Sequence, residues 1–295
     1  MFRAAILASL VAVAIGPDTA SQLVDLDVVA VNRDGLPVGD LSQGDFEIKE
    51  GGRPVTIETF TPVAARGVLD EERSVVLLMD DIGVPASGTS PMRQIGRVLL
   101  SPMRALDEVA VVRLSRPHDE AYGDVESARE RLEQYHGGAV PYASLETPVT
   151  VLKAVTRIAG ELEPIERRRK AVICVGVPAV CDVREPVASS TGEFRDAWMA
   201  AMSATARANV SVYEVDPRGL TSAAGPTGLG LVQFTGGEVV RNSNDFVDAA
   251  ARIWRDVSHY YLIGYRGRPA ASGPVRTIDV KVTRRGVEVR ARQRR

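Results

Sequence analysis

The hydrophobic pattern is most distinct at residues 74–81, where five consecutive apolar residues lead into the carboxylates Asp80 and Asp81. A run that is apolar at every position is typical of a parallel strand covered by helices on both faces. Ligands of open α/β sheets bind beyond the carboxyl ends of such strands, which makes both residues candidate ligand-binding residues. The alternative is that one of them caps the turn toward Gly83, since Asp before Gly and Pro is common turn chemistry.

From Ser74 to residue 258, short apolar runs alternate with amphipathic stretches. Val151, Leu152, Val155 and Ile158, for example, have the spacing of one helix face. This alternation predicts an α/β domain with a doubly wound, mostly parallel sheet. We expect strands at 74–79, 107–115, 171–177, 210–216 and 237–240, and helices at 90–100, 127–135, 148–162, 193–208 and 245–257.

Both ends of the chain show period-two alternation instead. Near the N-terminus, residues 23–32 and the turn that ends at Gly35 predict a β-hairpin. Near the C-terminus, the same alternation indicates strands with one buried and one solvent-exposed face. Because chain ends often lie close together, we expect these strands to form one small β module. The predicted organisation is an N-terminal β module at 21–64, an α/β domain at 72–258 and C-terminal strands at 259–295 that pack with the module.

The first 20 residues have the layout of a secretory signal peptide. Arg3 precedes an apolar run at 4–15, which ends before Gly16-Pro17 and contains the small-x-small sequence Ala12-Val13-Ala14. The run is shorter than the roughly 20 residues that a membrane-spanning helix needs. We therefore expect an exported protein, periplasmic or extracellular, without a transmembrane segment in the mature chain. A buried N-terminal strand or helix is the alternative.

Composition and charge limit the classes of function that fit the chain. The 36 basic and 38 acidic residues give a net charge of −2, so no overall field indicates nucleic acid or an anionic membrane as a partner. Four adjacent basic residues, 167–170, are interpreted as a solvated helix end rather than a phosphate-binding patch. The chain has no G-x-S-x-G or H-E-x-x-H sequence, and we expect no enzyme activity.

The two cysteines, Cys174 and Cys181, leave two possibilities open. Export into an oxidising compartment allows a disulfide between them. A bridge requires Cα atoms about 4.4–6.8 Å apart, and Cys174 lies in an expected buried strand while Cys181 lies beyond Pro178. The alternative is that Cys174 is a buried free thiol.

Three stretches together resemble the VWFA-related domain family first catalogued in acidobacteria. They read V-x-V-x-x-D-G-x-P-V-x-D-L-x-x-x-D-F-E-I-x-E-x-G from Val29 to Gly52, then S-V-V-L-L-M-D-D, and finally H-Y-Y-L-I-G-Y. The resemblance covers nearly the whole chain after residue 20. It implies a von Willebrand factor type A-like fold, flanked by β segments, in an exported bacterial protein.

This resemblance also implies a metal-ion-dependent adhesion motif, which here is degenerate. In type A domains, an Asp-x-Ser-x-Ser loop, a Thr and a further Asp hold Mg²⁺ or Ca²⁺ through oxygen ligands. Asp80 matches the first Asp, but Ile82 and Val84 replace the two serines and Gly176 follows the strand where the second acidic residue is expected. Hydroxyl candidates are Ser144 and Thr147. We expect no required cofactor, at most weak Mg²⁺ or Ca²⁺ binding at Asp80, and a hydrogen bond from the Gly83 N–H to Asp80.

Three functions are compatible with these features. The first is a non-catalytic exported interaction or adhesion module that binds an unknown protein or surface polymer through the top of the sheet. The second is a nucleotide- or metal-using α/β enzyme, suggested by the glycine-rich residues 225–230 and the paired carboxylates. The third is a structural subunit of an envelope assembly. The glycine cluster does not follow the first strand, as a phosphate loop does, so we prefer the first function.

Overall fold

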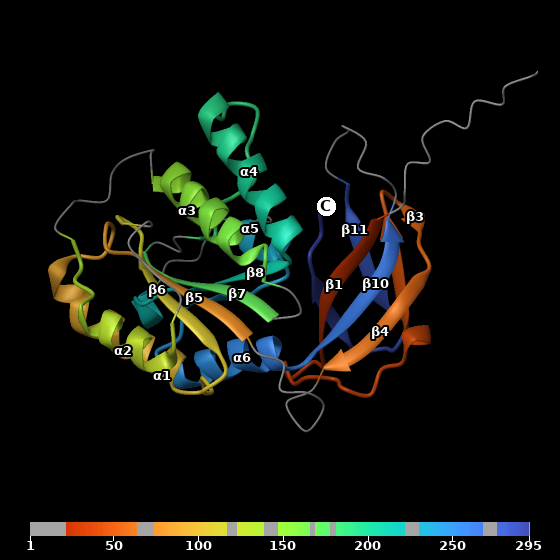
Figure 1. Cartoon of the computed structure of the whole chain (residues 1–295), viewed down its shortest axis with the longest axis horizontal. Coiled ribbons are helices and arrows are strands. Elements are labelled where there is room, and N and C mark those ends of the chain that lie inside the picture. The colour runs from red at the N-terminus through yellow and green to blue at the C-terminus, as the bar shows by residue number, and fades with distance from the viewer. Residues whose placement is uncertain are drawn as a thin grey trace, which may run out of the picture.

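The computed structural model describes residues 22–63, 73–116, 123–138, 147–165, 169–177, 181–221, 230–267 and 276–294. The expected signal peptide and Ser144 lie outside these ranges. The described residues form an α/β domain and, beside it, a β module (Figure 1). Within these ranges, no helix is long and apolar enough to cross a membrane.

The α/β domain is built on a five-stranded parallel sheet in the order β6-β5-β7-β8-β9. Every residue of the central strand is buried, as its uninterrupted apolar run predicts. The chain leaves this strand toward one neighbour and later returns on its other side, so the residue after it lies where the strand order reverses. The strands are β5 (Arg73–Met79), β6 (Glu108–Arg113), β7 (Arg169–Val175), β8 (Val210–Val215) and β9 (Val239–Val240).

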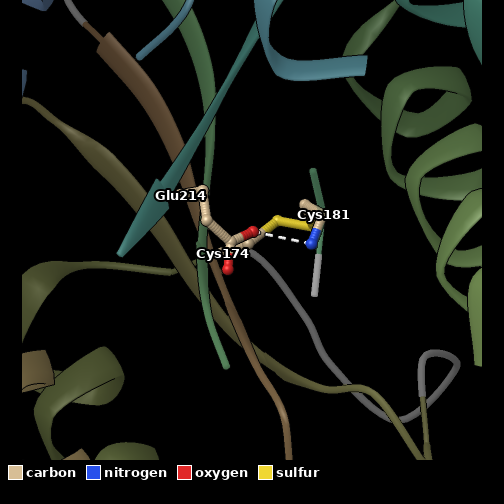
Figure 2. A group of neighbouring side chains, drawn as sticks. All are labelled: Cys174, Cys181 and Glu214. Atoms are coloured by element: carbon tan, nitrogen blue, oxygen red, sulfur yellow. Dashed lines mark hydrogen bonds between the residues drawn. A yellow bond between two sulfur atoms is a disulfide. The ribbon is translucent and has the colours of Figure 1, made fainter. Parts of the chain in front are cut away.

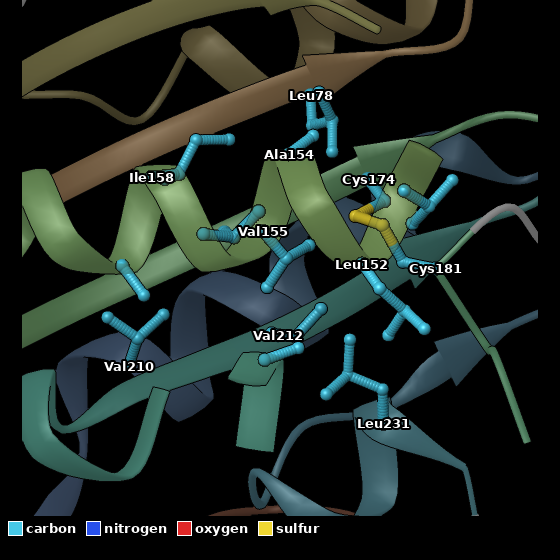
Figure 3. Close-up of a cluster of buried hydrophobic side chains, with 14 of the residues drawn as sticks. Leu78, Leu152, Ala154, Val155, Ile158, Cys174, Cys181, Val210, Val212 and Leu231 are labelled. Carbon is cyan, nitrogen blue, oxygen red and sulfur yellow. A yellow bond between two sulfur atoms is a disulfide. The ribbon is translucent and has the colours of Figure 1, made fainter. Parts of the chain in front are cut away.

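Helices cover both faces of this sheet (Figure 1). On one face lie α1 (Thr89–Leu100), α2 (Val125–Glu133) and α6 (Phe246–Ser258). On the other lie α3 (Thr147–Leu162), α4 (Gly192–Ala208) and the short α5 (Leu231–Phe234). Figure 3 shows apolar side chains of α3 and Leu231 of α5 beside those of the strands. Short 3-10 helices are η1 (Gln43–Asp45), η2 (Ala86–Gly88) and η3 (Gly219–Thr221).

The β module consists of two antiparallel sheets that share one apolar core, which contains Leu26, Phe46, Tyr261, Ile263 and Ile278. One sheet has the order β12-β1-β10-β4 and the other β11-β2-β3. Both chain ends therefore contribute to each sheet, which confirms the predicted fold class. The strands are β1 (Gln22–Val31), β2 (Phe46–Glu50), β3 (Arg53–Pro54), β4 (Ile57–Val63), β10 (Tyr260–Gly267), β11 (Ile278–Val282) and β12 (Glu288–Ala291).

The predicted hairpin after β1 is wrong. The turn itself forms, with Gly35 at φ 72°, but the chain beyond it makes a single bridge, between Val31 and Pro37. Instead, β1 pairs with β10 and β12, strands from the other end of the chain. Turn residues fix the local direction of the chain, whereas the pairing partner is the strand that completes the buried apolar face.

A buried ion pair connects the β module to the amino end of the parallel sheet. Arg169, the first residue of β7, is buried and pairs with Asp27 of β1. Its guanidinium also lies 4.8 Å from the ring centroid of Tyr260 and 3.4 Å from the Tyr213 hydroxyl. The interpretation of 167–170 as a solvated helix end is therefore wrong for Arg169 and for Lys170, because both are buried in β7.

Arg290 of β12 and Arg292, which follows that strand, also contact the α/β domain. Arg290 donates to Glu238 at 2.7 Å and to Asp256 at 2.8 Å. Arg292 donates to the Ala206 carbonyl of α4 and, within the β module, to the Asp25 carbonyl at 3.0 Å. This face, which period-two alternation predicts to be solvent-exposed, therefore packs against the α/β domain.

Candidate functional site at the carboxyl edge of the parallel sheet

Asp80 is fully buried at the carboxyl end of β5 and accepts three backbone hydrogen bonds. One oxygen accepts from the N–H groups of Ile82 at 3.1 Å and Gly83 at 2.7 Å. The other accepts from Val177 N–H, just beyond β7, at 3.1 Å. The predicted hydrogen bond from Gly83 is confirmed. This carboxylate therefore holds together the loops that follow two neighbouring strands.

The electrostatic surroundings of Asp80 oppose its charge. Burial raises the pKa of this carboxyl above its ordinary value, and the adjacent Asp81 raises it further. The hydrogen bonds from Gly83, Val177 and Ile82 lower the pKa, but they offset only part of the effect of burial. The three N–H groups thus replace the hydrogen bonds that water would donate to an exposed carboxylate.

Asp81 is occupied by a different neighbour. Its carboxylate accepts from both the N–H and the hydroxyl of Ser115, which lies just after β6. Its carbonyl accepts from Gly138 N–H at 2.7 Å, and a Cβ on Gly138 would lie 2.3 Å from that oxygen, so this close approach requires glycine. The buried Tyr135 hydroxyl donates to the Asp80 carbonyl at 2.7 Å. Both carboxylates that the sequence singles out therefore hold loops in place.

The residues that the structure describes around Asp80 do not fit the divalent cation that the family resemblance implies. Where the motif has serines, the side chain of Ile82 packs on one hydrophobic cluster and that of Val84 on the cluster of the opposite face. Gly176 brings no side chain, and Asp80 already accepts three N–H groups. Mg²⁺ and Ca²⁺ require about six or more oxygen ligands. Thr147 is the first residue of α3, and Ser144 lies outside the described residues.

Cys174 and Cys181 are joined in a disulfide, one of the two possibilities that the sequence leaves open. Their Cα atoms are 6.1 Å apart, within the range that a bridge requires. Both side chains are fully buried, and Figure 3 shows them within the cluster that α3 covers. The bridge ties the segment after β7 back onto that strand.

Other charged groups near this edge are also paired. Asp216, directly after β8, accepts from the backbone N–H and the guanidinium of Arg218, the latter as close as 2.6 Å. Asp182 pairs with Arg184 at 2.6 Å and with Arg241 at 2.5 Å. Gly230, the described member of the glycine-rich stretch, borders that carboxylate: a Cβ there would lie 2.5 Å from an Asp182 oxygen.

Two large apolar side chains are exposed on the loops at this edge. Leu220, in η3 after β8, is 69% exposed, and Val247, in the first turn of α6 after β9, is 67% exposed. The Leu220 N–H donates to the Asn244 side chain at 3.1 Å, which links the two loops. Sequence reasoning overlooked both residues, because apolar periodicity identifies the buried face of an element and not single apolar residues that face solvent. It also overlooked Ser115 and Tyr135, because the residues that they contact, Asp81 and Asp80, are distant in the sequence.

Comparisons with known proteins place the chain only distantly. No protein-family model matches the sequence, and no curated protein matches it. Human COPII-coat protein Sec24c aligns at 10% identity and TM-score 0.37, over 78% of this chain and 44% of that chain. A mutant of the PilB minor pilin from Streptococcus sanguinis aligns at 8% identity and TM-score 0.39, over 65% and 64%. The N-terminal domain of TFIIH p34 aligns at 12% identity and TM-score 0.31, over 62% and 97%.

The chain thus spans less than half of the Sec24c chain and less than two thirds of the pilin chain. At these scores the similarities assign no activity or partner to it.

Proposed function

We propose that the chain is a non-catalytic, exported interaction module that binds another protein through the carboxyl edge of its parallel sheet. The main observation behind this proposal is that the carboxylates of this edge are occupied, whereas two apolar side chains are exposed. Asp80 and Asp81 are occupied by backbone and hydroxyl donors, whereas Leu220 and Val247 are exposed on linked loops. The proposal assigns these two exposed apolar side chains to the contact with the partner.

Metal independence is part of the proposal. Binding through Leu220 and Val247 needs no cation, and among the described residues Asp80 already accepts three N–H groups while Ile82 and Val84 bring no oxygen ligands. Export is supported by the layout of the first 20 residues and by the disulfide, since such bonds persist in oxidising compartments. The resemblance to a family of exported proteins also supports export.

A photo-crosslinking experiment tests this function. A photoreactive amino acid is placed at 220 or at 247 in the full chain, expressed in the native host, and adducts are sought in the envelope and secreted fractions. The control position is Leu36, which is 46% exposed on the β module. We expect a defined protein adduct from the two edge positions, absent from the control and unchanged by EDTA.

Each other result rules out a part of the proposal. Adducts that vanish with EDTA and return with Mg²⁺ would show an obligatory metal. Equal adducts from position 36 would move the interface and favour a structural subunit that is contacted on several sides. A carbohydrate adduct at 220 would identify a surface polymer instead of a protein as the partner. Turnover of a nucleotide by the purified chain would favour the enzyme.

A further inference from the structure

Three potential metal ligands meet inside the α/β domain, near the carboxyl ends of β7 and β8 (Figure 2). The Sγ atoms of Cys174 and Cys181 and a carboxylate oxygen of Glu214 all lie within 4.8 Å of one another, and all three residues are buried. Glu214 on β8 is the direct cross-strand neighbour of Cys174 on β7, so their side chains share one face of the sheet. The Cys181 N–H donates to Glu214 Oε2 at 2.6 Å, which aims the carboxylate at the disulfide.

The carboxylate gives this place a third ligand atom beside the two sulfurs. The surrounding apolar cluster includes Leu152, Val183 and Leu231. Carboxylate oxygens of Asp and Glu bind Zn²⁺ together with Cys sulfurs in proteins.

We propose that Cys174, Cys181 and Glu214 form a zinc site when the disulfide is reduced. A dithiol supplies two electrons and two protons, the S–S bond breaks into two thiols, and the dithiol leaves as its own disulfide. Zn²⁺ then replaces the two thiol protons, which go to solvent. Two thiolates and one carboxylate are three of the four ligands of a tetrahedral zinc, and water supplies the fourth.

The geometry suits this ion better than the hard cations expected at Asp80. Two sulfurs bound at about 2.3 Å to one tetrahedral ion lie about 3.8 Å apart. Rotation about the Cα–Cβ bonds of the cysteines provides this separation, because their Cα atoms are already 6.1 Å apart. Thiolates select soft or borderline ions such as Zn²⁺ over Mg²⁺ and Ca²⁺. The same place thus alternates between a covalent bridge and a metal centre.

The test uses the full chain, oxidised or reduced with a phosphine that does not bind metal. Co²⁺ reports thiolate ligation by its sulfur-to-cobalt charge-transfer absorption in the near ultraviolet, and Zn²⁺ affinity is measured by competition with a chromogenic chelator. We expect one equivalent to bind to the reduced chain and none to the oxidised chain. Glu214→Gln, which keeps the hydrogen bond to Cys181, should weaken Zn²⁺ binding at least about tenfold.

Asp182→Asn is the matched control, since this neighbouring buried carboxylate is paired with Arg184 and Arg241 and should leave the affinity unchanged. If reduction unfolds the chain, Zn²⁺ should restore its far-UV circular dichroism, and Glu214→Gln should impair that recovery. The proposal is overturned if the reduced chain gives no thiolate-to-cobalt absorption, or if Glu214→Gln binds Zn²⁺ as tightly as the wild type.

Discussion

The two ends of the parallel sheet both bury charged side chains, but they compensate these charges differently. At the carboxyl end, Asp80 accepts N–H groups from its own loop and from the loop after β7. At the amino end, Arg169 pairs with Asp27 from the β module, 142 residues away in sequence. Also at that end, Arg73 donates to Asp107 and lies 4.6 Å from the centroid of the Trp254 ring.

The difference shows what each end does. Backbone donors hold a carboxylate within one structural unit, and the loops they position remain on the surface. A side-chain ion pair between two units joins them, because neither charge is compensated in the absence of the other unit. The amino end is thus where the β module attaches, and the carboxyl end is the surface that we propose for partner binding.

The largest expected effect comes from removing the ion pair that joins the β module to the α/β domain. Asp27→Ala leaves the buried guanidinium of Arg169 without its counter-charge, and we expect a loss of about 3–5 kcal/mol in the free energy of unfolding, measured by urea denaturation. The double variant Asp27→Leu/Arg169→Met removes both charges and should lose far less. Equal destabilisation of the single and double variants would contradict the role of the pair.

The next largest effect is expected at the carboxyl end of the sheet. Asp80→Ala leaves three buried N–H groups without their acceptor, and we expect a loss of about 2–3 kcal/mol in urea denaturation. Asp80→Asn keeps an acceptor and should cost about 1 kcal/mol. Neither Mg²⁺ nor EDTA should shift the melting temperature of the wild type. A Mg²⁺-induced rise that Asp80→Ala abolishes would show that this residue binds a cation.

A pH dependence should distinguish two carboxyls at the amino end. Burial and the nearby Glu238 raise the pKa of Asp256 to about 6, although Arg290 opposes this, so the folded chain holds a proton that the unfolded chain releases above about pH 4. The contribution of Asp256 to stability is present below that pH and is lost as pH rises through about 6. Between pH 4 and 7, the wild type should lose on the order of 1–3 kcal/mol relative to Asp256→Asn.

The pKa of Asp107 is shifted in the opposite direction, so its contribution to stability depends on pH with the opposite sign. Burial by itself would raise its pKa, but hydrogen bonds from Arg73 and from the Arg104 N–H outweigh burial and hold the pKa below the ordinary value. Its contribution is therefore present above about pH 4 and is lost as pH falls further. Urea denaturation of Asp107→Asn and Asp256→Asn over pH 3–7 checks both, and the same pH trend in the two variants would contradict these assignments.

The smallest expected effect concerns the exposed edge. Leu220→Ser and Val247→Ser should each change the free energy of unfolding by less than about 0.5 kcal/mol, because both side chains are mostly exposed. They should nevertheless reduce crosslinking to the partner. Destabilisation as large as that of Asp80→Ala would mean that these residues support the fold rather than present a surface.

Local patterns in the sequence were enough to predict the fold class and most elements. The continuous apolar run before Asp80 predicted a strand that is buried on both faces, and β5 is buried throughout. Helical spacing placed α3 and α6 within one or two residues of their observed bounds. Periodicity succeeds here because it reports which faces of an element are buried, which is a property of the element itself.

Only the tertiary structure decided which charges meet. The basic residue Arg169 and the acidic residue Asp27 look like surface residues in the sequence, and neither signals a partner. The same holds for Glu214, an ordinary alternating position of a strand until β7 brings Cys174 beside it. Strand pairing between distant segments sets these contacts, and a carboxylate or guanidinium has no periodicity that reveals its counter-charge. The sequence therefore determined the framework, while long-range packing determined where its charges are compensated.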